Sequence, residues 1–154
     1  MNRVRRSFLH RLAGSVGALA VASAAGFLRS AQAWAWNKAG FESKAITEVL
    51  KSLGATSPSD SRDIAITAPD IAENGAVVPV AVTSRIPNTQ QISIVAEKNP
   101  FPLAATFEVA GGGEGYVSTR IKMGQTSDVW AVVKASGRFY TAKKEIKITV
   151  GGCG

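Results

Sequence analysis

Cysteine and histidine are nearly absent from this sequence, which holds one cysteine, Cys153, and one histidine, His10, in 154 residues. His10 lies in a segment that we expect to be removed, so we expect no histidine in the mature protein. Ser-His-Asp and Cys-His catalysis, haem attachment through C-x-x-C-H and the usual zinc sites need imidazole or several thiolates. We therefore predict no catalytic residue, no metal site and no cofactor. The acidic residues show no metal-loop spacing and are assigned to turns and surface, among them Asp60, Asp63, Asp70 and Glu73.

The sequence also lacks a long uninterrupted apolar run. The run from Leu12 to Leu28 is broken by glycine and serine, whereas a membrane span needs about 20 mostly apolar residues. It follows the pair Arg5-Arg6 and precedes Ala31-Gln32-Ala33, a small-residue cleavage site. This order is typical of a twin-arginine signal peptide, here residues 1–33, and predicts export to a bacterial periplasm. An N-terminal membrane anchor is the alternative; after cleavage we expect no membrane attachment.

Acidic residues are missing from the predicted signal, which contains five arginines. Without them, the 18 basic residues of the chain fall to 13 against 11 acidic ones, and the net charge falls from +7 to +2. The positive charge therefore belongs mainly to the signal, and we predict no nucleic-acid partner.

One helix is predicted at the start of the mature chain. Ser43 can cap its beginning and Gly54 can end it. Apolar residues recur in this stretch at spacings near the helical period, namely Phe41, Ala45, Val49, Leu50 and Leu53. This apolar stripe must pack against another element. Residues 58–60 are expected to form a loop-type linker after the helix.

Beyond the linker, apolar residues alternate with polar ones as in β-strands. The predicted strands are 64–66, 76–82, 92–96, 103–109, 116–123, 129–133 and 138–150. Ser136-Gly137 is placed to turn the last two into a hairpin. Pro79 cannot donate to a ladder, so its strand is expected to be an edge or bulged there. We predict an all-β, immunoglobulin-like antiparallel β-sandwich with one N-terminal helix over residues 34–150.

A glycine run between two strands and three lysines in the last strand each have a structural and a functional interpretation. The run Gly111-Gly112-Gly113 joins two strands, so we interpret it as a flexible loop and not as a phosphate cradle. Three lysines of the last strand, Lys143, Lys144 and Lys147, are either a steering patch for anions or acidic partners, or a solvated strand face. We favour the solvated face.

Cys153 is the residue that carries chemistry. In an oxidising compartment, an unpaired cysteine indicates an intermolecular disulfide or a reactive thiol. Its neighbours Gly151, Gly152 and Gly154 have no side chains, so residues 151–154 are predicted to form a thin, flexible arm. Four extended residues reach roughly 13–14 Å, enough to enter a tunnel in a partner enzyme. Such an arm cannot hold active-site geometry itself, so catalysis is expected in partner proteins.

The ending Ile148-Thr149-Val150-Gly151-Gly152-Cys153-Gly154 resembles the C-terminus of the SoxY family, the carrier subunits of the thiosulfate-oxidising Sox system. The resemblance extends to Asn99-Pro100-Phe101-Pro102-Leu103-Ala104 followed by Phe107, to Ser118-Thr119-Arg120-Ile121-Lys122, and to the signal with its helix. It implies a SoxZ partner subunit and a covalent sulfur carrier, Cys153. It also implies that the haem protein SoxAX attaches thiosulfate, that SoxB hydrolyses off sulfate, and that SoxCD oxidises the remaining sulfane sulfur.

The resulting hypothesis is a periplasmic carrier of sulfur intermediates, not an enzyme, that presents its adduct to partner enzymes. The alternative is a structural or interaction β-sandwich whose terminal cysteine forms an intermolecular disulfide.

Overall fold

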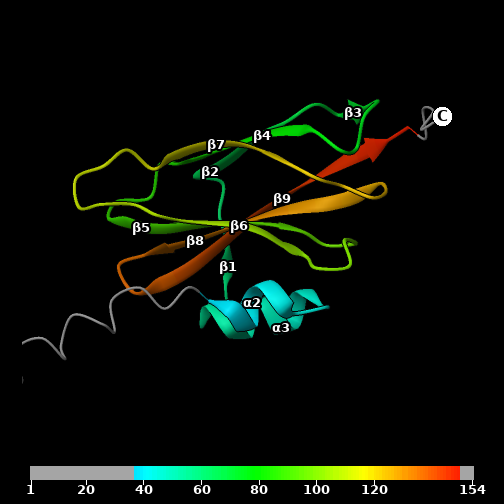
Figure 1. The fold of residues 1–154 in the computed structure, drawn as a ribbon. Helices are drawn as coiled ribbons and strands as arrows, with labels where there is room; N and C mark the ends of the chain where they lie inside the picture. Colours follow the sequence, from blue (N-terminus) through cyan, green and yellow to red (C-terminus); the bar gives the residue numbers. More distant parts are fainter. Residues whose placement is uncertain (1–36, 150–154) are drawn as a thin grey trace, which may run out of the picture. The chain divides into compact units, whose positions relative to one another are not determined.

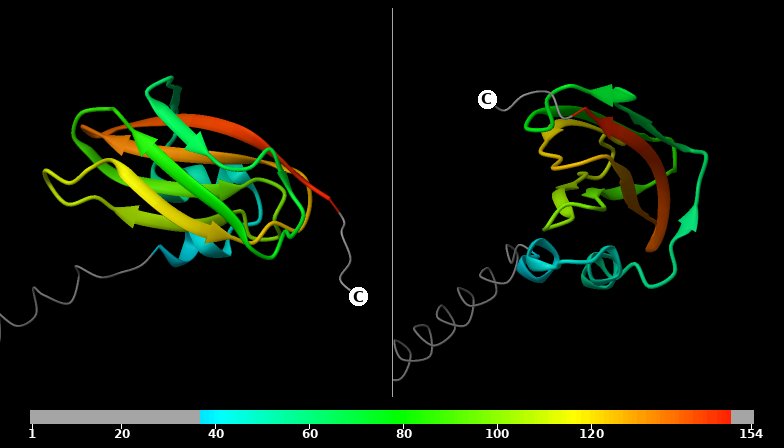
Figure 2. Two further views of the ribbon diagram at one scale, coloured as in Figure 1. Left: turned by 90° about the horizontal axis from the view of Figure 1, so that it is seen from above. Right: turned by 90° about the vertical axis from the view of Figure 1, so that its right-hand side faces the viewer.

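The computed structural model describes residues 37–149, in which two β-sheets pack face to face and two short helices lie on the outer face of the larger sheet (Figures 1 and 2). The larger sheet has the order β1 (Ser59–Asp60), β9 (Arg138–Ile148), β8 (Ser127–Ala135), β5 (Thr89–Ala96) and β6 (Leu103–Glu108), and β3 (Ile71–Ala72) also pairs with β9. The smaller sheet has the order β2 (Ile64–Thr67), β4 (Val78–Ser84) and β7 (Tyr116–Ile121). The predicted all-β sandwich is confirmed.

The main core lies between the two sheets and follows from strand alternation. In β4, Val78, Val80 and Val82 are buried, while the residues between them are exposed or half-buried. They meet buried side chains of the larger sheet such as Ile94 and Ile146. Each fully buried aliphatic side chain contributes about 1.5–3 kcal/mol relative to an exposed one. The period-2 pattern of the sequence therefore specifies which face of each strand forms the core.

The N-terminal region forms two helices, α2 (Lys38–Glu42) and α3 (Ile46–Leu53), where the sequence predicted one. Ser43 is not the start of a helix as predicted, because it takes an extended conformation with ψ 143° and its hydroxyl donates to the Ala39 carbonyl. It therefore ends α2. The predicted end at Gly54 is confirmed: its φ is +81°, the left-handed conformation that favours glycine.

The helices cover one part of the larger sheet and form a second apolar cluster with it. Val49 of α3 is fully buried and packs in this cluster with Val95, Leu103 and Val132 from the sheet. Figure 2 shows both helices on this side of the sheet, opposite the smaller sheet. The predicted apolar stripe is thus buried against strands. No helix within residues 37–149 is long and apolar enough to cross a bilayer.

Two parallel strands were not predicted. Residues 58–60, expected to be a linker, contain β1, and residues 71–72 form β3; both pair in parallel with β9. Each has only two residues, too short for a detectable alternation. The remaining strand pairs are antiparallel, as predicted.

The predicted turn at Ser136-Gly137 is confirmed, whereas the predicted edge or bulge at Pro79 holds only locally. Ser136 and Gly137, with φ of 49° and 75°, form the tight turn between β8 and β9. The strand that contains Pro79 is central in the smaller sheet, but β2 pairs with β4 only as far as Ala81, so β4 has a single neighbour at Pro79. The missing N–H of proline is tolerated there for this reason.

Candidate functional site

The residues predicted to carry the function lie outside the described part of the chain. These are Cys153 and the glycines of its arm, Gly151, Gly152 and Gly154. The predicted signal peptide, residues 1–33, also lies outside it, so both segment boundaries stay predictions. Thr149 is the last described residue, four positions before Cys153. The site that the structure does describe is therefore the arm root, which we define as residues 147–149 and the side chains and backbone that contact them.

On one side of the arm root, β3 pairs in parallel with the end of β9. The amide of Lys147 donates a 2.9 Å hydrogen bond to the carbonyl of Asp70, and the amide of Thr149 donates a 3.2 Å hydrogen bond to the carbonyl of Ala72. Figure 1 shows β3 next to the end of β9. Two of the three amides of residues 147–149 are thus bound by β3 and the residue before it.

On the other side, β8 no longer pairs with β9. Their register ends at Ser127 opposite Ile146. The hydroxyl of Thr126, one residue before β8, accepts a 2.9 Å hydrogen bond from the amide of Ile148. The Thr126 side chain thereby takes the place of β8 as hydrogen-bond acceptor. Every backbone amide from residue 147 to residue 149 therefore has a partner.

The inner face of the arm root packs against the core. The side chain of Ile148 is half-buried against the main core cluster. A Cβ on Gly75 would lie 3.2 Å from Cγ2 of Ile148, so the turn after β3 approaches the arm root closely. Lys144 is half-buried in β9, and its Nζ donates to the Ala68 carbonyl at 2.6 Å and pairs with Asp70 at 2.9 Å. Residues 68–75 therefore form a strap along β9.

The comparison with protein families decides what this chain is related to. The family model for the sulfur oxidation protein SoxY matches residues 49–153. The chain belongs to the SoxY family. The match covers both sheets and extends to the predicted carrier cysteine, and it confirms the resemblance drawn from the sequence.

A solved SoxY structure is similar to this chain. The sulfur carrier protein SoxY from Chlorobium limicola f thiosulfatophilum is 39% identical over 65% of this chain and 93% of its own, with a TM-score of 0.58. A superoxide reductase (neelaredoxin) from Ignicoccus hospitalis is 21% identical over 57% of this chain and 81% of its own, with a TM-score of 0.50. The second likeness concerns the fold alone. The comparison with curated protein sequences gives no match.

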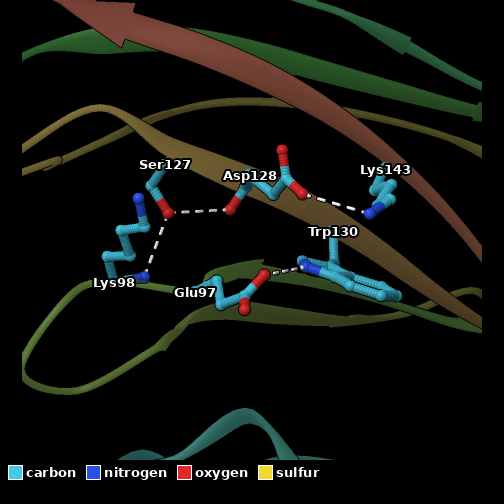
Figure 3. A network of polar contacts seen from close by, with 6 residues as sticks. All are labelled: Glu97, Lys98, Ser127, Asp128, Trp130 and Lys143. Carbon is cyan, nitrogen blue, oxygen red and sulfur yellow. Dashed lines mark hydrogen bonds and ion pairs between the residues drawn. The ribbon is translucent and has the colours of Figure 1, made fainter.

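The lysines of the last strand are mostly paired within this SoxY-family chain. Lys143 lies 3.2 Å from the carboxylate of Asp128 and 5.3 Å from the ring centre of Trp130, whose indole nitrogen donates to Glu97 at 2.8 Å (Figure 3). Because Lys144 pairs with Asp70, two of the three lysines have an acidic neighbour. These pairings argue against a steering patch. Lys143 and Lys147 are exposed on one face of β9, as the solvated-face interpretation predicts, whereas Lys144 lies on the opposite face and is half-buried.

Sequence reasoning missed the residues that hold the arm root. Thr126 and the strap 68–75 contain no motif, and their contacts with residues 147–149 span long distances in sequence. Asp70 was assigned to surface turns, and its side chain is indeed 88% exposed, yet its backbone carbonyl accepts a hydrogen bond from the Lys147 amide.

Within residues 37–149, no group of three or more His, Cys, Asp or Glu residues is placed to bind a metal.

Proposed function

We propose that this SoxY-family protein carries sulfur intermediates covalently on Cys153, at the end of the arm formed by residues 151–154. The observation that carries the proposal is the family match, because it runs through both sheets and reaches residue 153. The relative that is 39% identical is itself described as a sulfur carrier protein. The described structure supports the proposal by holding the chain firmly at Thr149, four residues before the thiol.

The chemistry explains why partner enzymes are needed. Joining thiosulfate to a thiol through a new S–S bond removes two electrons and the thiol proton. An electron acceptor must take up both electrons, and we propose that the haem protein SoxAX supplies it. Hydrolysis by SoxB then releases sulfate and leaves a persulfide, whose outer sulfur SoxCD oxidises. In this scheme the chain is the substrate-bearing arm and not the catalyst.

The partner subunit and the compartment belong to the same proposal. The family resemblance implies SoxZ as the partner subunit, and the twin-arginine signal predicts a periplasmic location. Export of folded proteins by this route allows a signal-less SoxZ to be carried out together with this chain.

Intact mass spectrometry tests the proposal. The mature protein is incubated with thiosulfate and the partner enzymes, and its mass is measured before and after reduction. We expect additions of sulfur or of one thiosulfate group that a thiol reductant removes. The variant Cys153→Ser should lose every addition and all turnover of thiosulfate, while its fold and subunit pairing stay unchanged.

A relocated thiol is the matched control. Ser57 is exposed in the loop after α3, so the double variant Ser57→Cys with Cys153→Ser keeps one accessible thiol away from the arm. It should not be loaded. If the wild-type protein shows only unmodified monomer and disulfide dimer, or if the relocated thiol is loaded equally well, the carrier proposal is wrong, and disulfide dimers would favour the structural alternative.

A further inference from the structure

We propose that Thr126 is a positioning residue that, together with β3, fixes the origin of the carrier arm at Thr149. This inference rests on the proposed function of Cys153, because it concerns how that residue is presented. Thr126 touches neither cargo nor thiol in this proposal. It acts on the last three residues of β9 through their backbone.

The hydrogen bonds of residues 147–149 show why the end of this strand is held. The end of a strand near a chain terminus normally frays, because its amides lose their partners to water. Here Lys147 and Thr149 donate to the carbonyls of Asp70, just before β3, and of Ala72 in β3, and Ile148 donates to Thr126 on the other side. The alternation of partners matches the alternation of amide directions along a strand. Thr126 is therefore the sole side-chain partner among the three.

The loop that carries Thr126 is itself fixed to a neighbouring loop. The Ser127 hydroxyl accepts from the amide of Lys98 at 3.0 Å (Figure 3), and the Gln125 side chain donates to the carbonyl of Lys98 at 3.2 Å. Asn99 adds two further bonds, donating to the Lys122 carbonyl at 2.6 Å and accepting from the Gly124 amide at 3.2 Å. These ties hold residues on both sides of Thr126. Its hydroxyl is thus presented from a prearranged backbone.

The position of the arm origin sets how far the thiol reaches. From Thr149, four residues lead to Cys153, an extended reach of roughly 13–14 Å. If residues 147–149 are released, seven residues form the tether and the reach grows to roughly 23–25 Å. The effective concentration of a tethered group falls roughly as the −3/2 power of the tether length, which here is about twofold. A held arm root therefore keeps the thiol concentrated near the end of β9.

The test compares Thr126→Val with two controls. Valine keeps the shape of threonine and removes the hydroxyl, so the Ile148 amide loses its acceptor. Thr126→Ser restores a hydroxyl at the same place and should rescue the effect. Thr83→Val is the matched control, because Thr83 is half-buried in β4 and its hydroxyl makes no hydrogen bond within the described residues.

Two measurements report on the arm root without any cargo. Amide hydrogen exchange of Ile148, followed by NMR, should become about five- to tenfold faster in Thr126→Val and stay near wild type in both controls. Nitroxide labels on Cys153 and on Ser118→Cys, an exposed residue of β7, should then give a broader distance distribution in Thr126→Val than in either control. Unchanged exchange, or faster exchange without broadening, would overturn the proposal.

A loading assay separates this inference from the proposed function. With thiosulfate and the partner enzymes below saturation, Thr126→Val should load Cys153 more slowly, by at most about twofold, the limit for full release of residues 147–149, while its reaction with a small free alkylating reagent stays unchanged. Loading at the wild-type rate despite an altered arm root contradicts the positioning role and leaves the carrier function intact. If the wild-type protein is never loaded on Cys153, the proposed function itself is wrong.

Discussion

Gly75 and Met123 lie backbone against backbone: the amide of Met123 donates a 2.7 Å hydrogen bond to the carbonyl of Gly75, and a Cβ on residue 75 would overlap the carbonyl oxygen of Met123. This contact joins the turn after β3 to the segment just after β7. Because the same turn touches Ile148, the contact also supports the arm root. Only glycine leaves room for it.

The substitution Gly75→Ala tests this close approach. The added methyl group must displace backbone, so we expect a loss of about 1–3 kcal/mol in the free energy of unfolding. Urea unfolding followed by circular dichroism measures it. Gly111→Ala is the control, because a Cβ at Gly111 would have no atom within 4 Å. Equal free energies of unfolding for the two variants would show that the backbone around Gly75 and Met123 accommodates a methyl group without loss of stability.

The two interactions of the Lys144 side chain can be separated by mutation. Asp70→Asn removes the ion pair only, and since the Asp70 side chain is 88% exposed we expect a change of less than about 1 kcal/mol. Lys144→Met also removes the donor to the Ala68 carbonyl and should cost a further 0.5–1.5 kcal/mol or so. Thermal unfolding at low and high salt checks both. A large, salt-dependent loss in Asp70→Asn would instead assign the strap's stability to the ion pair.

The turn between β8 and β9 offers a pair of substitutions with opposite signs. Both of its residues have positive φ, 49° at Ser136 and 75° at Gly137. Asparagine tolerates this region better than serine, so Ser136→Asn should stabilise the fold by about 0.5 kcal/mol, whereas Gly137→Ala should destabilise it by about 1 kcal/mol. Differential scanning calorimetry measures both shifts. A lower unfolding temperature for Ser136→Asn would contradict the assigned turn geometry.

The long elements of the fold could be predicted because each is a local pattern. The alternation in β4 and β8 repeats over several residues, and Ser136-Gly137 has the chemistry of a tight turn. Ser43 shows the limit of such reasoning. Serine is favoured at the start of a helix, yet Ser43 takes an extended conformation at the end of α2, and α3 begins at Ile46.

The arm root could not be predicted for a different reason. β3 has two residues, and its partners in β9 lie 76 positions later in the chain, as in the pair Ile71 and Lys147. Thr126 is one of many threonines in the sequence, and its hydroxyl gains a role only because β8 and β9 diverge after Ser127 and Ile146. Contacts of this kind depend on where strands end, which no local pattern specifies.

The sequence by itself determined the chemistry of this protein: one thiol, among glycines, in a chain with no histidine beyond the predicted signal, together with the alternation that makes a β-sandwich. These properties are local, because they depend on residue type and near neighbours. The tertiary structure alone decided how the end of β9 is held, since β3, Gly75 and Thr126 meet it only after the sheets have packed. The hydrogen bonds that hold residues 147–149 come from segments distant in sequence, and folding brings them together.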